Sequence, residues 1–76
     1  MPMTDDATRV RVIRAILGVT SGDFAALVGV DRATLTNWEK GKNRPQQTYQ
    51  VKLSELCKAS NISINEDGFP VPVYGA

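Results

Sequence analysis

TSGDFAALVGVDRATLTNWEKG, residues 20–41, is the stretch that decides the fold. Apolar residues recur at helical spacing in two short runs, which predicts two short helices joined by a tight turn. Thr20 followed by Asp23 resembles a capping box, with Asp in place of the usual Glu, and starts the first helix. Gly29 can adopt the positive φ that the turn needs, and Asp31 is a strong N-cap for the second helix.

The second of these helices, expected over residues 32–40, separates apolar from polar side chains. Projected at 100° per residue, Leu35 and Trp38 lie on its inner side and would pack the two helices together with Val30. The outer side carries no large apolar residue and consists of Arg32, Ala33, Thr36, Asn37 and Lys40. This is a helix-turn-helix arrangement, and a helix of this width fits the major groove of B-DNA.

Further helices are expected on both sides of this pair. Apolar residues at helical spacing predict a helix over residues 8–17, with Thr4, Asp5 and Asp6 as candidate N-caps and Gly18 as its stop. A fourth helix is predicted over residues 47–59. Its apolar side consists of Tyr49, Leu53, Leu56 and Cys57.

The last stretch, residues 62–76, has a different composition. Pro70 and Pro72 each remove an amide donor and fix φ, so this stretch cannot be helical and is either an extended edge segment or disordered. The chain therefore divides into an N-terminal flank over residues 1–7, a helical domain over residues 8–61 and a C-terminal tail.

Length and composition restrict the class of protein. With 76 residues, 42% of them hydrophobic and 22% charged, the chain is expected to form one small globular domain. No apolar run approaches the roughly 20 residues that span a bilayer, and the acidic start is unlike a secretory signal, so a cytoplasmic protein is expected. Cys57 is the one cysteine and histidine is absent, so no internal disulfide, zinc site, other cofactor or histidine-dependent catalysis is expected. Cys57 itself is expected to be a buried packing residue.

Charge is distributed unevenly along the chain, although the net charge is only +1. Residues 9–44 hold seven basic and three acidic residues, a local charge of +4. These residues are Arg9, Arg11, Arg14, Arg32, Lys40, Lys42 and Arg44, against Asp23, Asp31 and Glu39. A basic middle between acidic ends suits an anionic partner, although a neutral domain with a charged face would look similar.

Residues 13–45 resemble the phage-repressor (Xre/Cro-type) helix-turn-helix family, on the strength of IRAILGVT and DFAALVGVDRATLTNWEKGKNRP. The resemblance implies an all-α fold, a compact four- to five-helix bundle of the lambda-repressor-like type, here followed by an extended tail. It also implies binding of double-stranded DNA, usually as a homodimer on a palindromic operator, and most often repression. Many members carry glutamine where this chain has Ser21, and the shorter serine can reach a phosphate but is a doubtful reader of bases.

The resemblance and the outer face of the helix over residues 32–40 together predict the DNA-binding site. Base contacts are expected from Arg32, Ala33, Thr36 and Asn37. Phosphate contacts are expected from Arg14, Thr20, Ser21, Thr34, Lys40, Lys42, Asn43 and Arg44. Thr34 can equally bond back within its own helix. By resemblance, Arg14 and Glu39 form a pair that ties the helix over residues 8–17 to the helix over residues 32–40. For each charged residue the alternative is a solvated surface position.

Three classes of function are open at this point. The first is a stand-alone repressor, with the fourth helix and the tail as candidate dimer surfaces. In the tail, Val71, Val73 and Tyr74 would form an exchanged or paired strand, or else a mobile end. The second is an antitoxin that represses its own operon and binds a toxin partner through the tail. The third is an interaction module or enzyme, and the sequence offers no catalytic constellation.

Overall fold

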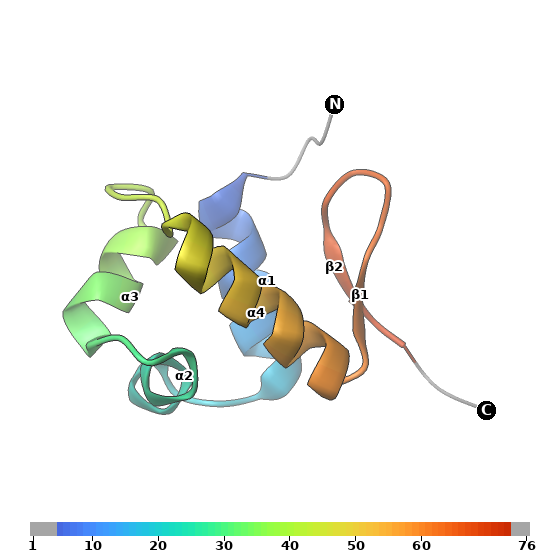
Figure 1. Ribbon diagram of the computed structural model, residues 1–76, viewed down its shortest axis with the longest axis horizontal. Helices are drawn as coiled ribbons and strands as arrows, with labels where there is room; N and C mark the ends of the chain where they lie inside the picture. The colour runs from blue at the N-terminus through green and yellow to red at the C-terminus, as the bar shows by residue number, and fades with distance from the viewer. Residues whose placement is uncertain (1–4, 74–76) are drawn as a thin grey trace.

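Four helices and a two-stranded hairpin make up residues 5–73, the part of the chain that the computed structural model describes (Figure 1). In chain order the elements are α1 (Asp6–Leu17), α2 (Ser21–Val28), α3 (Arg32–Glu39), α4 (Gln47–Ala59), β1 (Ile62–Ile64) and β2 (Pro70–Pro72). The predicted helical fold is confirmed, and α4 has the predicted bounds. Helix α3 ends one residue earlier than expected, because Lys40 is its C-cap.

Side-chain caps explain where the first three helices begin. The backbone amides of Thr8, Asp23 and Thr34 donate to the side chains of Asp5, Thr20 and Asp31, at 2.8, 3.1 and 2.7 Å. Asp5 is therefore the cap of α1, and the alternative at Thr4 lies outside the described residues. Hydrogen bonds from Thr8 and Thr34 lower the pKa of Asp5 and Asp31 respectively, because they stabilise the charged carboxylates.

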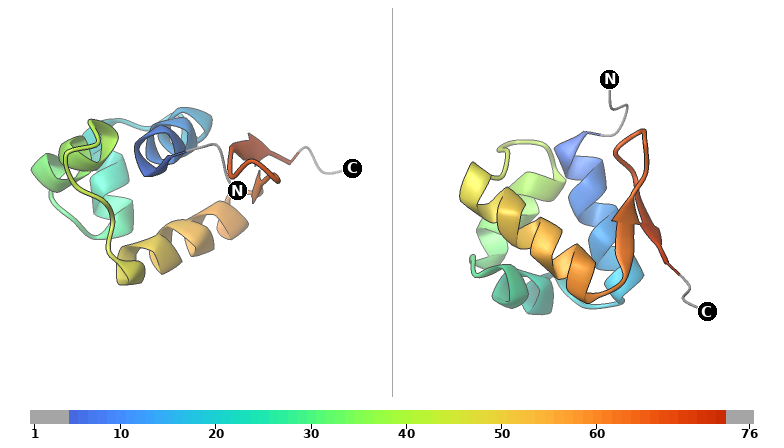
Figure 2. Two further views of the ribbon diagram at one scale, coloured as in Figure 1. Left: turned by 90° about the horizontal axis from the view of Figure 1, so that it is seen from above. Right: turned by 45° about the vertical axis from the view of Figure 1, so that its right-hand side comes forward.

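The helix pair and the hairpin lie at opposite ends of the molecule. Helices α2 and α3 occupy one end of the longest dimension and the hairpin the other, with α1 and α4 running between them (Figures 1 and 2). Helix α3 packs on α1 and α2, β2 packs on α1, and β1 packs beside the end of α4. The described residues measure 37 × 28 × 20 Å.

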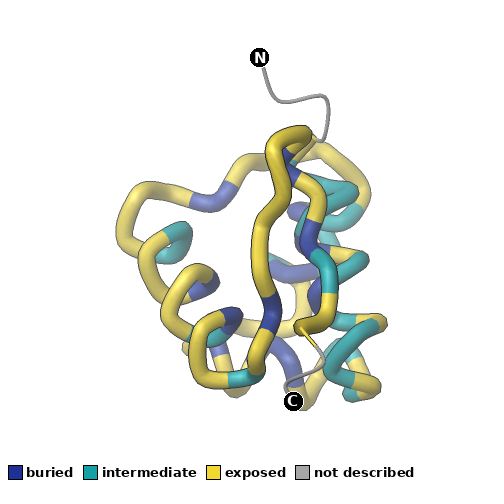
Figure 3. Tube along the Cα trace, turned by 90° about the vertical axis from the view of Figure 1, so that its right-hand side faces the viewer, coloured by how far each residue is buried: buried dark blue, intermediate teal, exposed yellow. Residues whose placement is uncertain are grey.

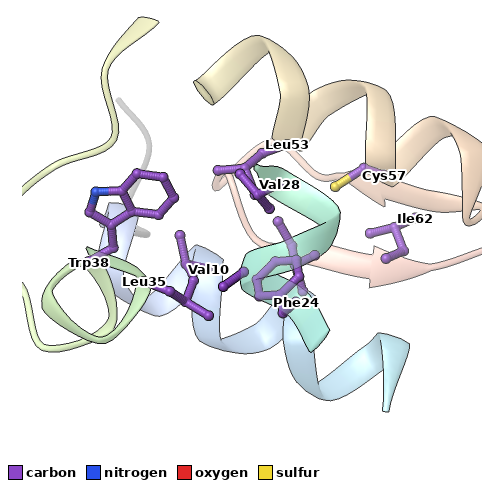
Figure 4. Close-up of a cluster of buried hydrophobic side chains, with 10 residues drawn as sticks. Val10, Phe24, Val28, Leu35, Trp38, Leu53, Cys57 and Ile62 are labelled. Carbon is purple, nitrogen blue, oxygen red and sulfur yellow. The ribbon is translucent and has the colours of Figure 1, made fainter. Parts of the chain in front are cut away.

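One hydrophobic core joins all the helices to the hairpin (Figure 4). Phe24 and Leu35 are fully buried at its centre, and Trp38 is 3% exposed. The other members are Val10, Ile13, Ala25, Val28, Leu53, Cys57 and Ile62. The ring of Trp38 lies 5.5 Å from that of Tyr49, so the inner face of α3 is held against α4 as well. The predicted buried positions of Trp38 and Cys57 are confirmed.

Residues 62–73 form an antiparallel hairpin, where the sequence left an extended or a disordered segment open. Ile62 pairs with Pro72, Ser63 with Val71, and Ile64 with Pro70. Val71 thus pairs within its own chain, and Tyr74 lies outside the described residues. Seen from the hairpin side, β1 is exposed except at Ile62, which is buried (Figure 3).

The turn between β1 and β2 supplies the reason that the hairpin forms. The side-chain oxygen of Asn65 accepts from the amides of Asp67 and Phe69, at 3.0 and 2.9 Å. Gly68 adopts a left-handed φ of +79°. An asparagine that bonds its own backbone and a glycine with positive φ define the turn. This signal was not used in the expectation from the sequence, which left an extended and a disordered segment open.

Between residues 5 and 73 no helix is long and apolar enough to cross a membrane.

Candidate nucleic-acid interface

The outer face of α3 is open to solvent. Arg32, Ala33 and Lys40 are exposed, and Thr36 and Asn37 are partly exposed. Leu35 and Trp38 point the other way, into the core (Figure 4). The face of α3 that is predicted to contact bases is therefore not packed against the rest of residues 5–73. The burial of the opposite face fixes the direction in which it points.

Within this face, Thr36 bonds back to its own helix. Its hydroxyl donates to the backbone oxygen of Arg32 at 2.9 Å, which turns its methyl group away from that bond. For Thr34, such a hydrogen bond within the helix was one of the two alternatives predicted from the sequence. At that residue the structure shows the backbone amide capped by Asp31, with the side chain partly exposed.

Residues predicted to contact bases and residues predicted to contact phosphates lie side by side at the start of α2. A Cβ built on Gly22 would lie 3.9 Å from Cδ of Arg32, so the stem of Arg32 passes beside the first turn of α2. Thr20 and Ser21 occupy that turn, Thr20 exposed and Ser21 partly so. Arg32 thus lies next to the helix N-terminus, whose backbone amides favour an anion.

Arg14 and Glu39 form a two-point ion pair between α1 and α3. Nε of Arg14 lies 2.7 Å from Oε2 of Glu39, and Nη2 lies 3.2 Å from Oε1. The Arg14 side chain is 31% exposed and that of Glu39 is 13% exposed. Hydrogen bonding to Glu39, with its negative charge, raises the pKa of the Arg14 guanidinium. The pair fixes α3 on α1 and leaves Nη1 of Arg14 to meet a further acceptor.

The loop after α3 is anchored by its backbone and presents its side chains outward. The amides of Lys42 and Asn43 donate to the carbonyl oxygen of Asn37, at 2.9 and 3.4 Å. Pro45 is buried, and its carbonyl oxygen accepts from the Gln50 side chain at 3.0 Å. The side chains of Lys40, Lys42, Asn43 and Arg44 remain exposed, beside the C-terminal end of α3.

Arg44 has a partner that sequence analysis missed. Its Nε lies 2.8 Å from Oδ2 of Asp6, whose other oxygen, Oδ1, lies 3.0 Å from Nη1 of Arg9. Nε of Arg9 in turn donates to the carbonyl oxygen of Gly68 at 3.1 Å. The Arg9–Asp6 spacing of three residues was visible in the sequence. The contact of Asp6 with Arg44, 38 positions away, gave no such signal.

The described residues form no metal site and contain no activated cysteine. Within residues 5–73 no group of three or more histidine, cysteine, aspartate or glutamate side chains could hold a metal ion. Cys57 is buried, and this burial raises the pKa of its thiol, so the nucleophilic thiolate is disfavoured.

Comparison with known proteins gives two matches. The family described as Helix-turn-helix matches residues 10–64, which run from α1 through β1. An uncharacterized HTH-type transcriptional regulator of Archaeoglobus fulgidus is 38% identical over 52 residues, which cover 68% of this chain and 74% of that protein. No solved structure matches the chain.

Proposed function

Because the chain belongs to the Xre/Cro-type helix-turn-helix family of DNA-binding transcriptional regulators, which are not enzymes, we propose that it is a repressor that binds a palindromic operator as a homodimer. The observation that carries the proposal is the exposed polar face of α3, held in place by the burial of Leu35 and Trp38. A rigid helix with this face enters the major groove. The operator is cytoplasmic DNA.

Base recognition falls to the outer face of α3. Arg32 has the reach and the paired donors to bind a guanine edge, and Asn37 can bind an adenine edge with two hydrogen bonds. Ala33 and the methyl group of Thr36 suit a thymine methyl, the latter supported by the hydroxyl's engagement with Arg32. These four residues set the operator sequence.

Phosphate contacts surround this face on two sides. Thr20 and Ser21 contact one backbone at the start of α2, and the loop after α3 contacts the backbone across the groove. The full set of proposed phosphate contacts is Arg14, Thr20, Ser21, Thr34, Lys40, Lys42, Asn43 and Arg44. Their positive charges release counterions, so binding weakens steeply with salt.

The test is in-vitro selection of duplexes from a random pool, followed by titration of the enriched duplex at several salt concentrations. The expected result is a palindrome whose half-site centres are about one helical turn apart, bound with strong salt dependence. Failure to enrich any sequence, or affinity that does not change with salt, would overturn the proposal.

The arrangement of the molecule favours a dimer formed through a side rather than through the hairpin end. Helix α3 and the hairpin lie at opposite ends of the molecule (Figure 1), and the inner face of α3 is buried in the core between them, so its exposed face points away from the hairpin. Two copies joined by the outer surfaces of their hairpins would turn their α3 helices in opposite directions. One straight duplex could not then contact both, so the surface along α4 is the better candidate.

A second candidate function, that of an antitoxin, is supported by the outer face of the hairpin. Phe69, Val71 and Val73 alternate along β2 and share a face, and Phe69 and Val73 are 39% and 50% exposed. The neighbouring turn carries Glu66 and Asp67. An apolar stripe beside two acids, far from α3, suits a basic protein partner that binds without displacing DNA.

Co-purification from the native host distinguishes the two candidates. Recovery of one small basic protein in a fixed ratio, lost in Phe69→Ser but kept in Leu27→Ser, would support the antitoxin. Leu27 is the matched control because it is also an exposed apolar residue, but on α2. A homodimer recovered alone would count against it.

A further inference from the structure

We propose that Asp6 is a positioning residue that holds Arg44 in the orientation for its phosphate contact, an inference that rests on the proposed DNA binding. Both oxygens of the Asp6 carboxylate are engaged, Oδ1 with Arg9 and Oδ2 with Arg44. The Asp6 side chain is 15% exposed, whereas that of Arg44 is 81% exposed. The mostly buried carboxylate of Asp6 thus binds Nε of Arg44, while the rest of the Arg44 side chain is exposed to solvent.

The acid itself is held firmly. Asp6 lies in the first turn of α1, and Arg9, three residues later, grips its carboxylate from the same helix. Arg9 also donates to the carbonyl oxygen of Gly68, so it connects α1 to the turn of the hairpin. Arg44, in contrast, belongs to the loop between α3 and α4. The contact therefore connects a long loop side chain to a fixed point and restricts its rotamers.

The geometry of the contact leaves the useful edge of Arg44 available. Asp6 accepts from Nε, so the terminal edge formed by Nη1 and Nη2 can bind both oxygens of a phosphate. Arg14 is also held through its Nε, there by Glu39. Two arginines beside α3 are thus each oriented by a carboxylate, and the second carboxylate is one that the sequence did not reveal.

A simple charge argument predicts the opposite effect for Asp6. A carboxylate near DNA repels phosphate, so its replacement by a neutral amide should strengthen DNA binding. If Asp6 instead positions Arg44, its replacement weakens DNA binding, because the guanidinium must be ordered at the moment of contact. The sign of the change in affinity therefore separates the two roles.

The experiment measures the affinity of the full chain for a fluorescein-labelled duplex, taken from the selection above, at several salt concentrations. We expect Asp6→Asn to bind about threefold to tenfold more weakly and with a shallower salt dependence. In an Arg44→Ala background the same substitution should not weaken binding, since the group that it positions is gone. Asp6→Glu, which keeps the carboxylate, should restore most of the affinity.

Glu66→Gln is the matched control, because it removes the same charge from an exposed side chain of the hairpin turn, close to the Arg9–Gly68 hydrogen bond, and should leave affinity unchanged. Thermal melting shows whether Asp6→Asn also lowers the stability of the protein. A loss of stability alone would not alter the salt dependence of DNA binding by the folded protein. The inference is overturned if Asp6→Asn binds as tightly as the wild type or more tightly, or weakens binding equally without Arg44. In either case the wild type still binds DNA. If the wild type shows no salt-dependent binding, the proposed function and this role fail together.

Discussion

At the scale of single residues, the candidate site combines side chains that face solvent with side chains that other residues hold in place. Arg32 and Lys40 are exposed on α3, whereas Arg14 and Arg44 are each gripped by a carboxylate. The exposed group can adapt to base edges, and the held group presents charge at a fixed place.

Arg32→Ala and Asn37→Ala test the reading face of α3. Each should weaken binding to the selected duplex about 10- to 100-fold, because a two-point contact with a base edge contributes about 1–3 kcal/mol. Fluorescence anisotropy measures the affinity, and repeating the selection shows whether one base position relaxes. Arg11→Ala is the control for lost charge, since Arg11 is exposed on α1 and is not one of the proposed DNA contacts. Wild-type affinity in both variants would remove α3 from the site.

Glu39→Gln tests the pair between α1 and α3. The substitution leaves Arg14 without its charged acceptor, and we expect a loss of about 1 kcal/mol in the free energy of unfolding, reduced from the buried case because Arg14 is a third exposed. Urea unfolding followed by Trp38 fluorescence gives the value. Glu55→Gln, on the exposed side of α4, should cost almost nothing. Equal stability of both variants would show that the pair contributes no measurable stabilisation.

Prediction from sequence succeeded at this scale where periodicity applies. Leu35 and Trp38 could be placed inward, and Arg32 outward, because a helix repeats every 3.6 residues. Asp6 could not be placed beside Arg44, because that contact depends on how α1 packs against a loop 38 residues away. Only tertiary structure carries that information.

At the scale of elements, local chemistry decided most boundaries. Helix α4 was predicted with its observed bounds, and Gly18 and Gly29 end α1 and α2 as expected. Both glycines are left-handed, which was expected for Gly29. The hairpin was not predicted, because Pro70 and Pro72 exclude a helix but leave open whether the stretch is an extended edge segment or disordered. In the structure these prolines lie in a strand, where the fixed φ is tolerated.

The N-cap of α3 gives a prediction about pH. The pKa of Asp31 is lower in the folded protein than in the unfolded chain, because the charged carboxylate accepts from Thr34. Its stabilising contribution is therefore present above the ordinary aspartate pKa of about 3.9 and is lost as pH falls through the lowered value. Melting temperatures between pH 6 and pH 2.5 should fall less steeply in Asp31→Asn than in the wild type. A parallel decline would show that this cap does not contribute to acid unfolding, and Glu66→Gln supplies the control for an exposed acid.

At the scale of the whole molecule, one small core has to support both the helix pair and the hairpin. Phe24 lies at its centre and Ile62 of β1 at its edge (Figure 4). A chain of 76 residues draws only a few kcal/mol of net stability from such a core. Damage at the centre should therefore unfold every element together.

Phe24→Ala tests this dependence. Truncating a buried phenylalanine costs about 3–5 kcal/mol, which is comparable with the whole stability of a domain of this size. We expect a protein that is largely unfolded at 37 °C, measured by circular dichroism. Leu27→Ala, in the same helix but at a 55% exposed position, should remain folded. A cooperative transition near the wild-type temperature in Phe24→Ala would contradict the view of a single shared core.

The two prolines of β2 have one more consequence. The bonds from Val73 to Asn61 and from Asn65 to Phe69 place the ring nitrogens of Pro70 and Pro72 on the strand's outer edge, where each would otherwise offer an amide hydrogen. This edge of β2 presents carbonyl oxygens but no amide donors to an approaching strand. A further strand therefore cannot form a regular ladder there, and fibres cannot grow from this edge. Crowding many copies at high concentration should consequently produce no lengthening stack of strands through β2.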